Sequence, residues 1–249
     1  MKTSGNTILI TGGGTGIGRG LAEAFAANGN TVIVAGRKRS TLDAVVAANP
    51  GITAIELDVA DPASIATVVP ALLRDFPGLD AVIHNAGMAK VEHIVDGKVA
   101  DAEATIATNV LGPIRLTAAL LPHLLAQPSA TIVTVTSGLA FVPLAASPTY
   151  SASKAALHSY TESLRHQLAG TQIGVLEIAP PYVQTELGGP EQATDPRAMP
   201  LADFIAETMA IITGGATSEV IVEQCRPLRD AEAKGQYAAT FAGVNAMFG

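Results

Sequence analysis

Short apolar runs alternate along the chain with longer stretches in which apolar residues recur at helical spacing. Seven of the short runs are rich in β-branched residues and predict buried strands. These runs are residues 7–11, 31–35, 52–57, 81–85, 131–136, 174–179 and 218–222. The stretches between them predict helices near 16–28, 40–48, 101–125 and 150–169. Asp61-Pro62 predicts the start of another helix, with a capping carboxylate and a proline at the first helical position.

This order of elements predicts an α/β fold. Strands joined by helical crossovers form a parallel sheet with helices on both faces, so we expect a doubly wound, Rossmann-like sheet of about seven strands. Residues 1–249 show no break in composition, no long linker and no internal repeat, which predicts a single domain. Residues 181–200 contain four prolines and no periodicity, which is typical of a lid or a binding loop.

Composition narrows the possible function classes. With 48% hydrophobic and 15% charged residues, the chain can bury a large core and is not expected to be disordered. A net charge of −7 argues against a nucleic-acid partner, which requires clustered Lys and Arg. The single cysteine, Cys225, excludes an intrachain disulfide and a thiolate metal cluster. The apolar runs are shorter than a membrane span of about 18 residues, and no signal sequence is recognised, so we expect a cytoplasmic protein without a membrane partner.

A glycine-rich turn lies between the first strand and the first helix. Glycines allow the backbone to turn sharply beside a pyrophosphate, and the helix N-terminus presents free N–H groups and a partial positive charge to it. The turn therefore predicts dinucleotide binding, with a purely structural turn as the alternative. No Gly-Lys-Ser/Thr follows, so it is not a Walker loop. The predicted contact residues are Gly12, Gly14, Thr15, Gly16, Ile17 and Gly18.

The end of the second strand carries a basic run. In a sheet of this type that position faces the adenosine ribose, and a carboxylate there would indicate NAD. Here Gly36 is followed by Arg37, Lys38 and Arg39, without an acid. A guanidinium pairs well with a 2′-phosphate, so Arg37 and Lys38 predict NADP(H) in preference to NAD(H). Three solvated charges at the start of a helix are the alternative.

Tyr150 and Lys154 are four residues apart in a predicted helix, which places them on one face. A free phenol has a pKa of about 10 and exchanges protons poorly at neutral pH. A cation close by favours the phenolate and lowers that pKa toward the range that general acid–base catalysis needs. The pair is therefore a candidate acid–base site, with an ordinary helix surface as the alternative.

In combination these features resemble the single-domain type of the short-chain dehydrogenase/reductase family. The resemblance extends from Thr7 to about Val222. Its motifs are Thr11-Gly12-x-x-x-Gly16-x-Gly18, Asn85-Ala86-Gly87, Asn109, Ser137, Tyr150 and Lys154. Ser137 precedes Tyr150 by thirteen residues, which is the family's usual separation. Residues 180–185 and 222–229 are similar to the subgroup named for D-alanyl-lipoteichoic acid gene clusters.

The resemblance implies a role for each motif residue. Tyr150 would give a proton to a substrate carbonyl in reduction and take it back in oxidation. Lys154 would lower the pKa of Tyr150 and hold the nicotinamide ribose, while Ser137 would hydrogen-bond the substrate oxygen. Asn109 would hold a water that links Lys154 to solvent. The resemblance implies further cofactor contacts at Asp58, Val59, Asn85, Ala86, Gly87, Pro180, Val183 and Thr185.

Two positions depart from the family's pattern. The asparagine that usually precedes Asn-Ala-Gly is His84, which we interpret as a core histidine with a satisfied ring. The usual Pro-Gly after the sixth strand is Pro180-Pro181, and a second proline can neither donate a backbone hydrogen bond nor adopt a positive φ. The nicotinamide contacts there are expected to differ. We expect no metal site, because the other histidines lack ligand-like spacing: His93, His123, His158 and His166.

These inferences predict an NADP-dependent carbonyl reductase or alcohol dehydrogenase for a small, mostly apolar ketone, aldehyde or alcohol. A nucleotide-bound sensor that does no chemistry is the alternative. Epimerase or dehydratase chemistry is a third possibility, but such members usually add a C-terminal substrate domain.

The alanine-rich helices at 101–125 and 150–169, which similar proteins pair across a two-fold axis, predict a homodimer or homotetramer. Candidate substrate-pocket residues are Met88, Leu139, Val142, Tyr182 and Leu187, with Met199 and Phe204 nearby.

Overall fold

A computed structural model of the chain describes residues 1–248. The described residues form one seven-stranded sheet in the order β3-β2-β1-β4-β5-β6-β7, in which every neighbouring pair is parallel. The predicted α/β sheet is thereby confirmed. The strands are β1 (Thr7–Thr11), β2 (Thr31–Gly36), β3 (Ile52–Glu56), β4 (Leu79–His84), β5 (Ala130–Val135), β6 (Ile173–Ile178) and β7 (Glu219–Val220).

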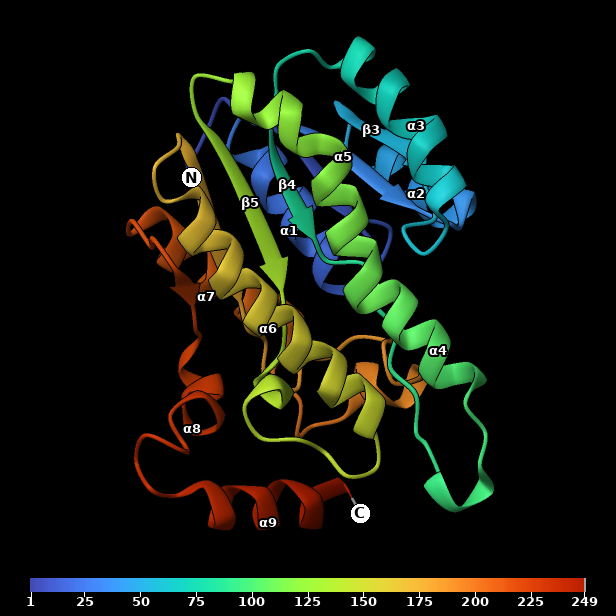
Figure 1. The fold of residues 1–249 in the computed structure, drawn as a ribbon, viewed down its shortest axis with the longest axis vertical. Coiled ribbons are helices and arrows are strands. Elements are labelled where there is room, and N and C mark those ends of the chain that lie inside the picture. The colour runs from blue at the N-terminus through green and yellow to red at the C-terminus, as the bar shows by residue number, and fades with distance from the viewer. Residues whose placement is uncertain (249) are drawn as a thin grey trace.

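Helices cover both faces of the sheet (Figure 1). On one face lie α1 (Gly16–Ala27), α2 (Arg39–Ala48) and α7 (Leu201–Thr213), and their apolar residues share a core cluster with Ile8 and Ile10 of β1. On the other face lie α3 (Pro62–Asp75), α5 (Gly112–Ala126) and α6 (Pro148–Leu168), which share a second cluster with Leu9. Successive strand residues point to opposite faces, so a continuous apolar run fills both cores.

Local sequence signals mark the starts of two helices that flank the sheet, α3 and α6. The Asp61 carboxylate accepts a hydrogen bond from the Ala63 N–H at 2.9 Å, and Pro62 takes the first helical position, as predicted. The helix α6 starts at Pro148, two residues earlier than predicted, because a proline is also well suited to its first position.

The long predicted helix at 101–125 is divided into three parts. It consists of α4 (Ala100–Ile106), a π-helical turn (Ala107–Leu111) and α5. Pro113 lacks the N–H that would close an α-helical turn onto the Asn109 carbonyl, which favours a widened turn at this point. By length and composition alone Ala100–Ala126 could cross a membrane, and 44% of its most apolar window is buried inside the fold.

The C-terminal part contains elements that the apolar pattern did not predict. These are α7, the short helix α8 (Arg226–Arg229) and α9 (Tyr237–Phe248). Figure 1 shows α9 below the carboxyl ends of the strands, beneath the chain that leads into α6. The strand β7 has two residues where 218–222 was predicted.

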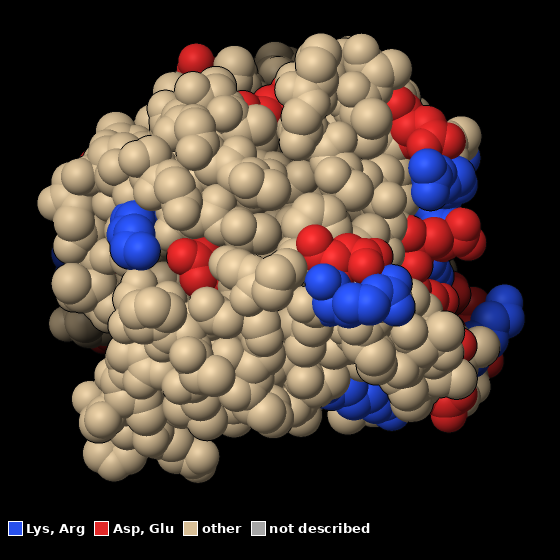
Figure 2. Space-filling view, turned by 90° about the horizontal axis from the view of Figure 1, so that it is seen from above, with Lys and Arg blue, Asp and Glu red and all other residues tan. Residues whose placement is uncertain are grey.

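Charged side chains are sparse on the face seen in Figure 2, and most Lys and Arg atoms there lie beside Asp or Glu. That face shows no extended basic patch of the kind that nucleic-acid binding requires.

Candidate active site

The glycine-rich turn is fastened to the end of β4 by Thr11 and Asn85. The Thr11 hydroxyl accepts from the backbone N–H groups of Asn85 and Ala86, both at 3.1 Å. The Asn85 side-chain amide donates back to the Thr11 and Gly12 carbonyls at 3.0 and 3.2 Å. Gly12 has φ +64°, and a Cβ there would lie 2.8 Å from Ala86 Cα, so this position requires glycine. The predicted Asn-Ala-Gly segment therefore holds the turn in shape.

The start of α1 offers unpaired backbone N–H groups. The residue that precedes the helix, Thr15, makes no side-chain capping bond. Gly16 has φ +51°, and a Cβ there would lie 3.3 Å from Thr185 Cγ2 in the chain after β6. The turn and the predicted carboxamide contact Thr185 thus lie close together, as the walls of one dinucleotide site would.

The basic run after β2 is divided between two roles. Arg39 forms an exposed i,i+4 pair with Asp43 at 2.8 Å inside α2. Arg37 and Lys38 are exposed and form no salt bridge with any residue in the range 1–248. They are therefore the two cations of the run available to a ligand beside the end of β2.

Asp58 and Val59, which follow β3, make contacts within the protein itself. The Asp58 carboxylate accepts from the Ala60 N–H at 2.9 Å. The Val59 side chain is buried, and a Cβ added at Gly112 would lie 3.0 Å from it. The adenine contact implied for Asp58 and Val59 stays a prediction.

Asn109 lies in the π-helical turn and is almost fully buried. Its side-chain oxygen accepts from the Met88 N–H at 2.9 Å, and its amide donates to the Met88 carbonyl and to Ser153 Oγ, each at 3.0 Å. Asn109 thus holds the chain after β4 against α6. The implied water at Asn109 stays a prediction.

Tyr150, Ser137 and Lys154 meet at the end of β5. Lys154 Nζ donates to the Val135 carbonyl at 2.8 Å and lies 5.6 Å from the centre of the Tyr150 ring. Ser137 follows β5, and its hydroxyl accepts from the Leu139 N–H at 3.1 Å. The Ser137 side chain also lies near enough to the Tyr150 hydroxyl to lower its pKa. The chain after β4 joins this group, because a Cβ at Gly87 would lie 3.4 Å from Asn109 Oδ1 and 3.7 Å from Lys154 Nζ.

The expected direction of the Tyr150 pKa shift is wrong for this state of the protein. Burial raises the pKa of Tyr150 to about 12, and the hydrogen bond from Ser137 offsets only part of that effect. Burial also lowers the pKa of Lys154 to about 8. Desolvation therefore exceeds the effect of the neighbouring ammonium, whose donated bond is directed to Val135. Tyr150 carries its proton at neutral pH.

Residues 181–200 fold back on themselves instead of forming an open loop. Val183 pairs with Met199 in an isolated parallel bridge. The Tyr182 hydroxyl donates to Asp195 at 3.2 Å, and Arg197 pairs with the same carboxylate at 2.7 Å. The Gln192 amide donates to the Val183 carbonyl at 2.8 Å. These bonds give the segment a defined surface that faces α9.

The helix α9 bridges the two loops that flank Tyr150. Asn245 accepts from the Ala145 N–H at 2.6 Å and donates to the Pro143 carbonyl at 3.2 Å. In the same last turn of α9, the Met247 carbonyl accepts from Arg197 at 2.7 Å, and the Phe248 ring meets the Tyr182 ring edge-on with the ring centres 4.9 Å apart. This helix was not predicted from the sequence. Its signal is a stretch without charge or proline at 237–248.

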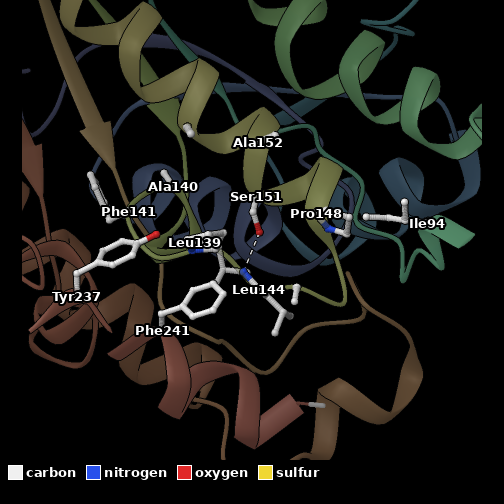
Figure 3. A pocket seen from close by; sticks show the side chains of 13 residues that line it. Ile94, Leu139, Ala140, Phe141, Leu144, Pro148, Ser151, Ala152, Tyr237 and Phe241 are labelled. Carbon is white, nitrogen blue, oxygen red and sulfur yellow. Dashed lines mark hydrogen bonds between the residues drawn. The ribbon is translucent and has the colours of Figure 1, made fainter. Parts of the chain in front are cut away.

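An apolar groove of about 560 Å³ lies between α9, α6 and the chain after Ser137 (Figure 3). In this view the rings of Tyr237 and Phe241 extend from α9 toward that chain. Ser151, the residue after Tyr150, accepts from the Leu144 N–H at 3.1 Å and fastens the chain to α6. The main apolar residues of the groove are Ile94, Leu139, Phe141, Leu144, Tyr237 and Phe241.

The predicted substrate pocket needs one correction. Val142 is fully buried, so its side chain packs inside the fold and lines no accessible surface. Phe204 is equally buried and belongs to the core between α1 and α7. Leu139 lines the groove, and Leu187 is 42% exposed at the edge of the 181–200 segment. Met88, Leu139, Tyr182 and Leu187 stay predicted pocket residues.

The two departures from the family's pattern have different consequences. His84 is 3% exposed, its Nε2 lies 2.9 Å from Thr117 Oγ1, and burial lowers its pKa to about 4. It is therefore a neutral core histidine, as predicted. At the other site the Pro180 carbonyl accepts from the Gly138 N–H at 2.8 Å, which ties the chain after β6 to the residue that follows Ser137. Pro181 then leads directly into the folded segment at 181–200.

Comparison with known proteins agrees with this geometry. The family model described as short chain dehydrogenase matches residues 6–196. The uncharacterized oxidoreductase DltE of Bacillus subtilis is 38% identical over 256 residues, which cover 98% of each chain. A short chain dehydrogenase from Burkholderia cenocepacia, solved in complex with NADP, has a TM-score of 0.82 at 25% identity and covers 98% of this chain and 99% of that one. Another from Burkholderia phymatum, solved in complex with NAD, has a TM-score of 0.81 at 23% identity and covers 94% of this chain and 96% of that one.

The chain therefore belongs to the short-chain dehydrogenase family, an oxidoreductase family, as its motifs predicted. Within that family it is similar to DltE over nearly its whole length, which also confirms the predicted subgroup.

Proposed function

We propose that the protein is an NADP(H)-dependent oxidoreductase that transfers a hydride between the cofactor and a ketone, an aldehyde or a secondary alcohol. The observation that carries this proposal is the meeting of Ser137, Tyr150 and Lys154 at the end of β5, with Asn109 fixing the neighbouring chain. A protein that only binds a nucleotide has no need of these four residues together.

The residues present fit a nicotinamide dinucleotide. Gly12 and Gly16 have positive φ angles of 64° and 51°, which give the turn its tight shape. The start of α1 leaves its N–H groups free for a pyrophosphate. Similar structures hold NADP in one case and NAD in the other, so likeness alone does not choose between them. Arg37 and Lys38, exposed and unpaired within residues 1–248, favour the 2′-phosphate of NADP(H). The cofactor supplies the hydride, and the protein orients it.

In carbonyl reduction Tyr150 is the proton donor. Its raised pKa keeps the phenol protonated at neutral pH, which is the form that can give a proton to a developing alkoxide. The Ser137 side chain lies beside the Tyr150 hydroxyl and would donate to the same substrate oxygen. In oxidation the phenolate of Tyr150 would take the proton back.

The substrate is a small and mostly apolar carbonyl compound. The surfaces around the mouth of the site come from Leu139, Leu187, Phe248 and other uncharged side chains. In the 181–200 segment, Asp195 and Arg197 are paired with each other at 2.7 Å. A charged substrate would therefore find no free partner there, whereas an apolar one would be desolvated favourably.

The decisive experiment measures NADPH oxidation against a panel of ketones, aldehydes and diketones, with NADH measured in parallel. Turnover of at least one uncharged carbonyl with NADPH is expected. Tight NADPH binding without turnover of any compound would instead favour a nucleotide-bound sensor.

We also propose that the protein works as a homodimer or homotetramer in the cytoplasm. The outer faces of the π-helical turn, α5 and α6 expose Leu111, Leu125 and the small residues Ala118, Ala152 and Ala156. An apolar face with small side chains allows two helix pairs to approach closely. The single buried cysteine, Cys225, is compatible with a reducing compartment.

A further inference from the structure

A buried carboxylate on β6 lies behind the catalytic residues. The Glu177 side chain is completely inaccessible to solvent. Its carboxylate accepts from the Thr136 hydroxyl at 2.7 Å and from His158 Nδ1 at 2.8 Å. A buried charge is costly unless it is paired and hydrogen-bonded, and both conditions are met here.

The two partners of Glu177 come from the elements that carry the catalytic residues. Thr136 directly precedes Ser137 at the end of β5, and His158 lies on α6 one turn after Lys154. Glu177 therefore connects β5 to α6 through one side chain. The Thr136 backbone N–H also donates to the Ile178 carbonyl at 2.8 Å, so Thr136 is held at two points.

Further side chains surround the pair formed by Glu177 and His158. The Phe141 ring meets the His158 ring edge-on at 4.9 Å, and the Arg229 guanidinium lies over the other side of Phe141 at 4.8 Å. Arg229 is paired with Glu219 at 2.9 Å. His158, Glu177 and Glu219 offer donor atoms within 4.8 Å of one another, but Arg229 already supplies the cation at Glu219. We therefore interpret this group as an ion-pair network and not as a metal centre.

We propose that Glu177 and His158 are positioning residues for the reaction proposed above: they fix Thr136, and through it the Ser137 hydroxyl, relative to the helix that carries Tyr150 and Lys154. This inference rests on the proposed function. Neither residue touches the reacting atoms. Their effect is on the distance and angle between the two groups that bind the substrate oxygen, and such geometry strongly controls the rate of the chemical step.

The test compares Glu177→Gln, Thr136→Val and Thr136→Ser by steady-state kinetics and by NADPH titration. Thr136→Val removes the hydroxyl at nearly constant volume, and Thr136→Ser keeps it. We expect Glu177→Gln and Thr136→Val to lower kcat by about tenfold or more, with the Kd for NADPH within about twofold of wild type. Thr136→Ser should restore most of kcat, which a loss of general stability would not predict.

Glu219→Gln is the matched control. It removes a carboxylate from the same network, but one that bonds to Arg229 and not to Thr136 or His158. It should leave kcat unchanged. An equal loss of kcat in Glu219→Gln and Glu177→Gln, or a normal kcat in folded Thr136→Val, would overturn the proposal. If Glu177→Gln does not fold, the comparison of Thr136→Val with Thr136→Ser still tests the positioning role.

The titration of His158 gives a readout that does not need turnover. Glu177 raises the pKa of His158 above its usual value against the opposing effect of burial, with smaller contributions from Glu162 and Arg229. Proton NMR should therefore show an imidazole pKa above about 6.5 that falls in Glu177→Gln. An unshifted imidazole in wild type would contradict the ion pair.

The results expected if the proposed function is wrong differ from those expected if only the positioning role is wrong. In that case the wild type turns over no carbonyl with either cofactor, or Tyr150→Phe retains full activity. Failure of the positioning role instead leaves an active enzyme that depends on Tyr150 and is insensitive to Thr136→Val.

Discussion

The ammonium of Lys154 donates to the backbone carbonyl of Val135 at 2.8 Å. Val135 is the last residue of β5 and lies two positions before Ser137. The lysine of the helix is thus fastened to the strand that presents the serine. Burial governs the pKa of Tyr150, although the Lys154 ammonium lies only 5.6 Å from the centre of its ring. The bond to Val135 keeps Lys154 beside the position proposed for the nicotinamide ribose.

The first prediction concerns Tyr150→Phe, which keeps the ring and removes the proton. Because Tyr150 is the proposed general acid, turnover should fall by roughly 10²-fold or more. NADPH affinity, measured by fluorescence titration, should stay close to wild type because the ring still fills the same space. Ser151→Ala is a control at the adjacent position. Near-normal turnover in Tyr150→Phe would exclude the proposed mechanism.

The second prediction is a loss of reductase activity at alkaline pH. Burial lowers the pKa of Lys154 to about 8, so the lysine is charged below that pH and neutral above it. The rate of reduction should therefore decline as the pH rises through about 8, while Tyr150, with its raised pKa, still carries its proton.

Two substitutions test whether the loss of the Lys154 charge causes the alkaline decline in rate. Lys154→Arg should have a lower rate but no decline between about pH 8 and 10, because arginine keeps its charge. Lys154→Ala should lose both turnover and NADPH affinity, since Lys154 is proposed to act on Tyr150 and on the ribose. The same alkaline decline in Lys154→Arg would show that another group titrates.

The sheet and the meeting of the motif residues could be predicted from the sequence. Residues 8–10 are apolar at three consecutive positions, and a parallel strand with helices on both faces needs that pattern. Ser137, Tyr150 and Lys154 were predicted to meet because their spacing resembles that of a family with one fold. The fold then brings the end of β5 beside the first turns of α6.

Other features of the site could not be predicted, because residue spacing does not show how deeply a side chain is buried or which residues face one another across the fold. The direction of the Tyr150 pKa shift follows from the depth of burial, which opposes the charge effect on which the prediction relied. The pair of Glu177 and His158 requires the register of β6 against α6. The helix α9 was missed because its residues are apolar on all sides, so no periodic face marks it.

The third prediction concerns α9 as a wall of the substrate site. Asn245→Ala removes the two hydrogen bonds that join α9 to residues 143–145. Each such bond contributes about 0.5–1.5 kcal/mol, so local opening of α9 should become about tenfold easier or more. Hydrogen exchange of the amides in 237–248 should accelerate, and KM for the carbonyl should rise more than the Kd for NADPH.

Thr240→Ala is the matched control for that experiment. It removes a side-chain bond within the same helix, from Thr240 to the Gln236 carbonyl at 3.0 Å, and leaves both loop contacts intact. It should leave exchange and KM near wild type. Unchanged exchange in Asn245→Ala would mean that the asparagine does not hold α9 in place.

The fourth prediction is assembly through α5 and α6. Sedimentation at micromolar concentration should give a dimer or tetramer. Ala156→Glu places a charge on the exposed face of α6 and should shift the protein toward monomer. Ala47→Glu makes the same change on α2 and should have no effect. A monomeric wild type would contradict this prediction.

The last prediction concerns cofactor choice at the end of β2. Arg37 is exposed there beside Gly36, and no carboxylate follows the strand in sequence. A charge-assisted contact with the 2′-phosphate contributes about 1.5–3 kcal/mol, so NADPH should be preferred over NADH by roughly 10–100-fold in kcat/KM. Lys38 is also exposed and without a salt bridge within residues 1–248, so Arg37→Ala alone should remove only part of that preference.

The double variant Gly36→Asp with Arg37→Ala should lower the preference for NADPH over NADH more than Arg37→Ala alone. It adds an acceptor for a ribose 2′-hydroxyl and a charge that repels the phosphate. Arg39→Ala is the matched control, because Arg39 is already paired with Asp43 at 2.8 Å and its loss should leave the ratio nearly unchanged. The measurement is kcat/KM for both cofactors at fixed ionic strength, since exposed charge pairs are screened by salt. Equal use of the two cofactors by the wild type, or a ratio that the double variant does not move, would show that the basic run is only the solvated start of α2.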